Sequence, residues 1–119
     1  MTALAQIALE FCRECMGWDA KPSTMYADSL MVLREGERQT WRYADLNAVM
    51  EAVGGWCDET ESSLRIGYGY GRFFKGEWDV TIDTSVGGAT YVNRSPCHAL
   101  LAACVEANRE RQAVHRETS

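Results

Sequence analysis

The segment that decides the fold is Leu64–Asp83, which reads LRIGYGYGRFFKGEWDVTID. Apolar residues alternate with polar or small ones at both of its ends, at Leu64, Ile66, Tyr68 and Tyr70 and again at Trp78, Val80 and Ile82. A period of two is typical of strands with one buried face and one wetter face. We therefore predict an antiparallel pair of strands, with the turn between them at Lys75-Gly76.

Further strands are expected on both sides of this pair. A third strand is predicted at about Ala89–Asn93, after a turn at Val86-Gly87-Gly88. Earlier in the chain, Ser29–Arg34 and Arg38–Tyr43 contain residues that tolerate strand geometry, and the turn Glu35-Gly36-Glu37 lies between them. These two segments predict a hairpin.

Three segments repeat their apolar residues at steps of three and four, as amphipathic helices do. They are Thr2–Met16, Ala44–Thr60 and a last helix that opens at Ser95-Pro96. Gly17 is a helix stop, whereas Ser95 and Pro96 suit a cap and a first helical position. The expected stripe of the second helix is Leu46, Val49, Met50, Val53 and Cys57. Gly54-Gly55 inside it indicates close packing or an early end.

The remaining segments are polar. Trp18–Thr24 contains Pro22 and is expected to be a loop, and the charged residues 109–119 are expected to form a frayed tail. Residues 1–108 then make a single α+β domain. We predict three helices packed with an antiparallel sheet of about three to five strands, arranged like an α/β/α sandwich.

Composition narrows the class of protein. The 119 residues are 46% hydrophobic and 24% charged, which is ordinary for a globular domain. A net charge of −5 argues against general nucleic-acid binding, which needs a basic surface. The sequence contains no apolar run long enough to span a membrane, and its start lacks the basic region of a signal peptide. We therefore expect a cytoplasmic protein that does not interact with membranes.

The sequence offers no convincing reactive set. Cys12 and Cys15 have the spacing of zinc and redox motifs, but they fall inside an amphipathic helix and have no matching second pair. The odd count of five cysteines indicates reduced thiols that pack in a core. His98 and His115 have no evident catalytic partner. We predict a protein that is not an enzyme and holds neither a metal nor a cofactor.

The segment Gly67-Tyr68-Gly69-Tyr70-Gly71, which we call the glycine-tyrosine strand, has two interpretations. Its glycines could let another segment pack closely against bare backbone. Alternatively, this strand and the chain that follows it could face a ligand, because basic and aromatic side chains together suit a nucleotide or an acidic partner. The candidate binding residues are Arg65, Tyr68, Tyr70, Arg72 and Lys75.

Three stretches together resemble a known family. They are Tyr43–Val53 (YADLNAVMEAV), Trp78-Asp79-Val80 and Arg94–Ala103 (RSPCHALLAA), preceded by a first helix that ends in Met16-Gly17-Trp18. In this order they resemble the phage ABA-sandwich domain proteins, over about residues 3–107. The resemblance implies helical layers around a sheet and an origin in a phage or prophage. It carries no catalytic or ligand-binding motif, and the chain departs from the family in its longer segment 26–43 and in its glycine-tyrosine strand.

Two functional hypotheses follow. The first is a non-enzymatic accessory protein that binds a host protein, such as an inhibitor of CRISPR interference or another bacterial defence system. An acidic surface would suit the basic nucleic-acid channel of such a target. The alternative is a binder that sequesters a nucleotide signal. Trp41, Trp56 and the tyrosine-rich strand are candidates for a homodimer surface.

Overall fold

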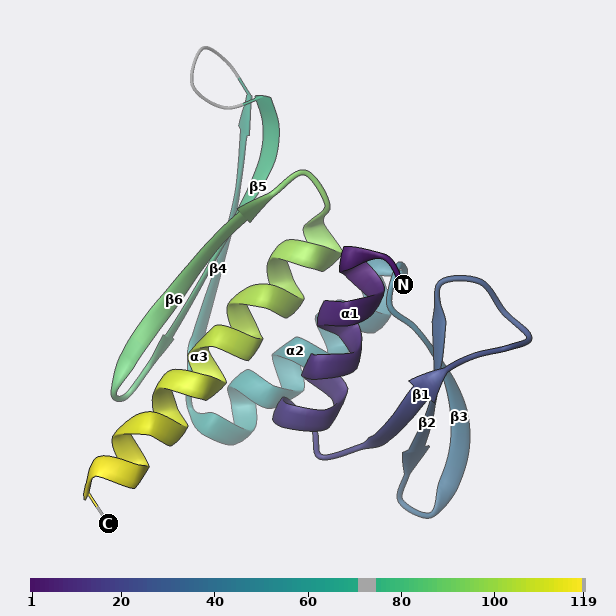
Figure 1. The fold of residues 1–119 in the computed structure, drawn as a ribbon. Helices are drawn as coiled ribbons and strands as arrows, with labels where there is room; N and C mark the ends of the chain where they lie inside the picture. The colour runs from purple at the N-terminus through teal and green to yellow at the C-terminus, as the bar shows by residue number, and fades with distance from the viewer. Residues whose placement is uncertain (71–74, 119) are drawn as a thin grey trace.

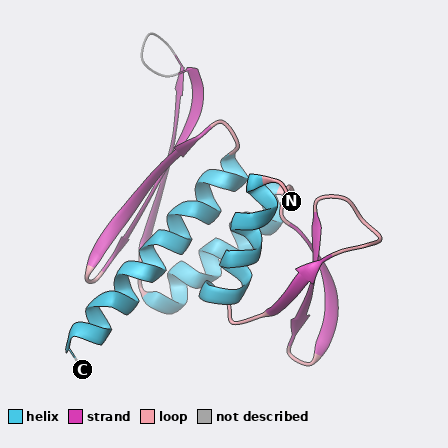
Figure 2. Ribbon diagram, in the orientation of Figure 1, coloured by secondary structure: helices cyan, strands magenta, loops and turns pink. Residues whose placement is uncertain are grey.

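The chain folds as an α+β domain with its helices between two small sheets (Figure 1). The computed structural model describes residues 1–70 and 75–118, and these contain three α-helices and two antiparallel three-stranded sheets. The α+β class, the three helices and the antiparallel strands are thus confirmed. The strands do not form one sheet, however. Figure 2 shows a sheet on each side of the helical layer.

The first helix ends in an unusual turn. Helix α1 (Ala3–Glu10) is capped by the Thr2 hydroxyl, which accepts from the Ala5 backbone N–H at 3.1 Å. It continues as a π-helical segment η1 (Phe11–Cys15), and Gly17 stops it with φ +66°. A π-helical turn inserts an extra residue, so the periodicity of the sequence predicted the helix but not this change of pitch.

The first sheet is built on strand β2 (Ser29–Arg34), which pairs with β3 (Glu37–Arg42) as predicted. Glu35 and Gly36 both have positive φ, which suits a two-residue hairpin turn. Strand β1 (Asp19–Pro22) pairs with the other edge of β2, although these residues were expected to be a loop. Only one of its four residues, Ala20, is buried, so the segment gives no apolar alternation in the sequence.

Helix α2 (Leu46–Thr60) begins after the predicted start at Ala44, and the Asp45 carboxylate caps it by accepting from the Asn47 backbone N–H at 3.0 Å. Its buried face differs from the expected stripe. Leu46 is 39% exposed, whereas Trp56 is buried at 3%. Trp41 is also buried, so neither of these tryptophans can contribute to a homodimer surface.

The glycine pair in α2 neither ends the helix nor packs closely, contrary to expectation. The helix continues to Thr60, and a Cβ placed on Gly54 or Gly55 would meet nothing within 4 Å. We expect Gly55→Ala to raise the free energy of unfolding by about 1 kcal/mol, because alanine loses less backbone entropy in a helix. Urea unfolding followed by circular dichroism measures this change.

A glycine in the second sheet provides the control for that substitution. A Cβ on Gly88 would lie 2.6 Å from Asp83 Oδ1 and 2.9 Å from the Ile82 carbonyl oxygen. Gly88→Ala should therefore destabilise the chain, since backbone atoms cannot easily move aside. A destabilising Gly55→Ala would contradict the open space beside α2.

The second sheet has the order β4 (Ser63–Tyr70), β5 (Lys75–Thr84), β6 (Gly87–Asn93). The predicted strand pair is confirmed, but Lys75 and Gly76 belong to β5 and not to a turn. Tyr70 pairs with Lys75 and Gly69 pairs with Glu77, so Gly76 is the extra residue of a β-bulge, with φ +72°. Gly87 and Gly88 likewise belong to β6.

Helix α3 (Pro96–Thr118) packs on β5 and β6 and contributes the longest buried run of the core. Its predicted start is confirmed, because the Ser95 hydroxyl accepts from the His98 backbone N–H at 3.2 Å. The segment expected to fray from residue 109 is helical through Thr118. Among the described residues, no helix combines the length and apolarity needed to cross a membrane.

Candidate binding face on the β4–β5 hairpin

The pairing of the second sheet places apolar residues in rows across its helix-facing side. One row runs from Tyr91 on β6 through Val80 on β5 to Ile66 on β4. The next row pairs Trp78 with Tyr68. Alternate residues of a strand point to opposite faces, so Ile66, Tyr68, Trp78 and Val80 share the face that looks toward the helices.

The helices cover only part of this face. Helix α3 packs on β5 and β6, and Val80 and Ile82 are completely buried there. On the edge strand β4, in contrast, Ile66 is 41% exposed and Tyr68 is 57% exposed. Figure 1 shows the β4–β5 hairpin continuing past the start of α3. An apolar row that begins in the core therefore runs out into solvent on β4.

We call the exposed Ile66 and Tyr68, together with the half-buried Trp78 beside them, the hairpin face. The rings of Tyr68 and Trp78 lie 4.8 Å apart with a tilt of 55°, so they support each other. The two rings are carried by paired strands and not by a loop. Binding a partner would therefore cost these side chains less conformational entropy. The hairpin face is suited to burying aromatic surface against a partner.

The opposite side of the hairpin is polar. Arg65 and Asp83 form an ion pair at 3.0 Å between exposed side chains. Thr81 and Thr90 are hydrogen bonded at 3.0 Å beside them, and Glu77 and Asp79 share this face by their pairing with Gly69 and Gly67. The hairpin is thus amphipathic, with an aromatic side and a side that carries three carboxylates and Arg65.

The structure separates the residues that the sequence proposed as one binding group. Arg65 and Tyr68 are three positions apart on one strand, so they point to opposite faces. Arg72 lies outside the described residues, as do the side chains of Tyr70 and Lys75. Of the five candidates, Tyr68 belongs to the hairpin face, and Arg65 is paired with Asp83 behind it. Ile66 and Trp78 were not proposed, although alternation within each strand groups Ile66 with Tyr68 on β4 and Trp78 with Val80 on β5.

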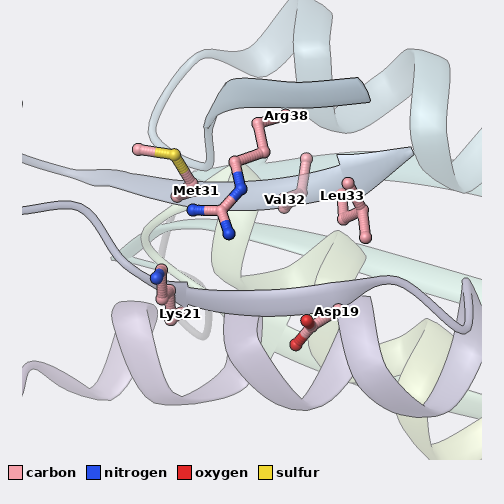
Figure 3. Close-up of a pocket in the computed structure, with 6 residues that line it drawn as sticks. All are labelled: Asp19, Lys21, Met31, Val32, Leu33 and Arg38. Atoms are coloured by element: carbon pink, nitrogen blue, oxygen red, sulfur yellow. The ribbon is translucent and has the colours of Figure 1, made fainter. Parts of the chain in front are cut away.

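A hollow on the outer side of the first sheet offers a second candidate. Figure 3 shows Arg38 reaching from β3 across β2 toward β1, between Met31 and Leu33. Lys21 and Asp19 complete its charged lining. The hollow has a volume of about 60 Å³, which is far below that of typical small-molecule sites. Two cations beside one carboxylate could hold an ion or water but could not enclose a nucleotide.

A groove along α2 is larger, at about 330 Å³. Arg34 lies at its edge with the guanidinium carbon 4.4 Å from the centre of the Trp18 ring. Glu51 and Glu59 line the same groove. Two carboxylates oppose phosphate binding, so this groove does not suit the nucleotide hypothesis.

Three buried thiols and the half-buried His98 are held by packing and not in a reactive arrangement. Burial raises the pKa of Cys12 to about 12 and also raises the pKa of Cys57 and of Cys97. His98 stacks on Tyr91 at 5.6 Å, and burial lowers its pKa. Within residues 1–70 and 75–118, no three His, Cys, Asp or Glu side chains are grouped so that they could hold a metal ion.

Comparison with known proteins leaves the relationships of the chain open. No family model, no curated protein and no solved structure matches it. The resemblance to the phage ABA-sandwich domain proteins therefore stays a prediction from sequence motifs.

Proposed function

We propose that this chain is a non-enzymatic accessory protein of a phage or prophage that binds a host protein through the hairpin face. The proposed phage origin rests on the sequence resemblance alone. The proposed mode of binding rests on one observation, the two apolar rows that run from β5 to the exposed side chains of Ile66 and Tyr68 on β4. Exposed aromatic residues on a rigid element are typical anchors of protein interfaces.

The charge of the hairpin suggests the kind of target. Glu77 and Asp79 flank Trp78 on β5 and point to the polar side behind it. Asp83 lies further along the same side, paired with Arg65, and the whole chain carries −5. A partner with an apolar pocket beside a basic nucleic-acid channel would match both faces of the hairpin, because the pocket would receive the hairpin face and the channel would attract the carboxylates of the polar side. Defence nucleases guided by nucleic acid have such channels, because they hold a polyanion. We therefore propose inhibition of a bacterial defence system, such as CRISPR interference, as the activity.

The experiment that tests this function has two readouts. The tagged chain is captured from a bacterial lysate and examined by native mass spectrometry, and a phage targeted by CRISPR is plated on cells that express the chain. We expect one host protein at fixed stoichiometry and a higher plating efficiency. Unchanged plating together with bare protein would contradict the proposal.

The nucleotide alternative has less support, because Arg65 and Tyr68 lie on opposite faces and Arg65 is already paired with Asp83. We expect no measurable heat when cyclic dinucleotides are titrated into the protein at micromolar concentration. If they do bind, Arg65→Glu combined with Arg72→Glu should abolish binding by reversing the charge that meets the phosphates. Binding that depends on these two arginines would favour sequestration over the hairpin-face proposal.

A further inference from the structure

Two thiols that are far apart in the sequence lie side by side in the helical layer. The Sγ atoms of Cys15 and Cys104 are 3.9 Å apart, and the Cys104 thiol donates toward the Cys15 sulfur. The Cys15 thiol in turn donates to the Cys104 carbonyl oxygen at 3.7 Å. Both cysteines are free in the structure.

Polar contacts hold the two elements that carry these thiols. Cys15 ends η1, and Cys104 lies in the middle of α3. One turn further along α3, the Asn108 side-chain amide donates to the Glu14 carbonyl oxygen at 3.2 Å. Arg109 donates to both carboxylate oxygens of Glu14, at 2.8 and 2.7 Å. These bonds keep η1 against α3, so the two sulfurs face each other in a fixed register.

The two sulfurs are in contact but are not at bonding distance. A disulfide has sulfurs about 2 Å apart, so the pair must approach by roughly another 2 Å. We expect rotation of the two side chains to supply this approach while η1 stays packed against α3. Access differs between the two thiols, because Cys15 is half-buried and Cys104 is fully buried. A reagent in solution therefore reaches Cys15 first.

We propose that Cys15 and Cys104 form a reversible oxidation site whose oxidant is a small-molecule disulfide. The Cys15 thiolate attacks one sulfur of the oxidant, forms a mixed disulfide and releases one thiolate. The buried Cys104 thiol then attacks the Cys15 sulfur and passes its proton to the second thiolate of the oxidant, which leaves as a thiol. Two cysteine thiols are oxidised and one disulfide is reduced to two thiols, so electrons and atoms balance.

The bond would join residues 89 positions apart and would close most of the chain into one loop. A loop of this length strongly restricts the unfolded ensemble. We expect oxidation to raise the melting temperature by about 10 °C or more. The site is independent of the hairpin face, and its test does not depend on the proposed function.

The test uses the full chain incubated with glutathione disulfide. Intact mass should fall by about 2 Da with no glutathione attached, and peptide mapping should find Cys15 linked to Cys104. Dithiothreitol should restore both the mass and the original melting temperature. A stable glutathione adduct on Cys15 as the end product, or an unmodified chain, would overturn the proposal.

Two variants make the result specific. Cys15→Ser should abolish both the loss of mass and the thermal shift, and a half-buried position tolerates this change. Cys97→Ser is the matched control, since Cys97 is a buried thiol at the start of the same helix as Cys104. It should still form the bond. Loss of 2 Da that persists in Cys15→Ser would assign the oxidation to another pair.

Discussion

Replacing Ile66 and Tyr68 together with threonine should lower affinity for the host partner by about 100-fold or more while the fold persists. Each removed anchor is expected to cost about 1.4 kcal/mol or more of binding free energy, which is tenfold in the dissociation constant. Stability should fall by only about 1–2 kcal/mol, because both side chains are already about half exposed and threonine tolerates strand geometry. Titration calorimetry with the captured partner and urea unfolding measure the two effects separately.

The other side of the same sheet supplies the control for that variant. Val92 on β6 is 40% exposed and pairs with Asp79, so it belongs to the polar face. Val92→Thr exchanges an exposed methyl group for a hydroxyl without touching the hairpin face, and it should leave the affinity unchanged. If both variants weaken binding equally, the partner does not recognise the hairpin face.

Most helices and strands could be predicted from the periodicity of apolar residues and from a helix-capping residue. The elements that were missed have local physical causes. Periodicity identified α2 and α3, and Ser95 caps α3 as predicted, whereas the Asp45 cap of α2 was not predicted. Strand β1 was missed because a four-residue edge strand with one buried side chain leaves no alternation. The division of the strands into two sheets was also missed. The period of a strand shows that it has two faces but does not show which neighbour it pairs with.

The candidate site was predictable only in part. The odd spacing of Arg65 and Tyr68 already implies opposite faces, so the proposed group could have been divided from the sequence. The exposure of Ile66 could not be predicted, because it depends on how far α3 reaches across the sheet. The contact between Cys15 and Cys104 likewise arises from helix packing between distant segments, which no local pattern encodes.

Trp41→Ala should have the largest effect on stability, a loss of about 3–5 kcal/mol in the free energy of unfolding. Trp41 points from β3 into the core, where its ring stacks on Phe11 at 5.8 Å and meets Trp18 edge-on at 5.9 Å. The alanine would leave a cavity at the junction between the first sheet and the helices. A domain of this size is typically stable by only 5–15 kcal/mol, so the variant should be close to unfolding. Urea denaturation monitored by far-ultraviolet circular dichroism gives the change.

The specific cause of that loss can be checked with a conservative variant. Trp41→Phe keeps an aromatic ring between Phe11 and Trp18. Its loss in the free energy of unfolding should therefore be less than half of the loss caused by Trp41→Ala. The second sheet packs mainly on α3, whereas Trp41 lies in the first sheet, so the hairpin face should keep its partner in Trp41→Phe. Equal destabilisation by alanine and phenylalanine would mean that the indole N–H, and not ring packing, holds the first sheet. An unchanged midpoint for Trp41→Ala would show that the first sheet is attached to the helices by other contacts.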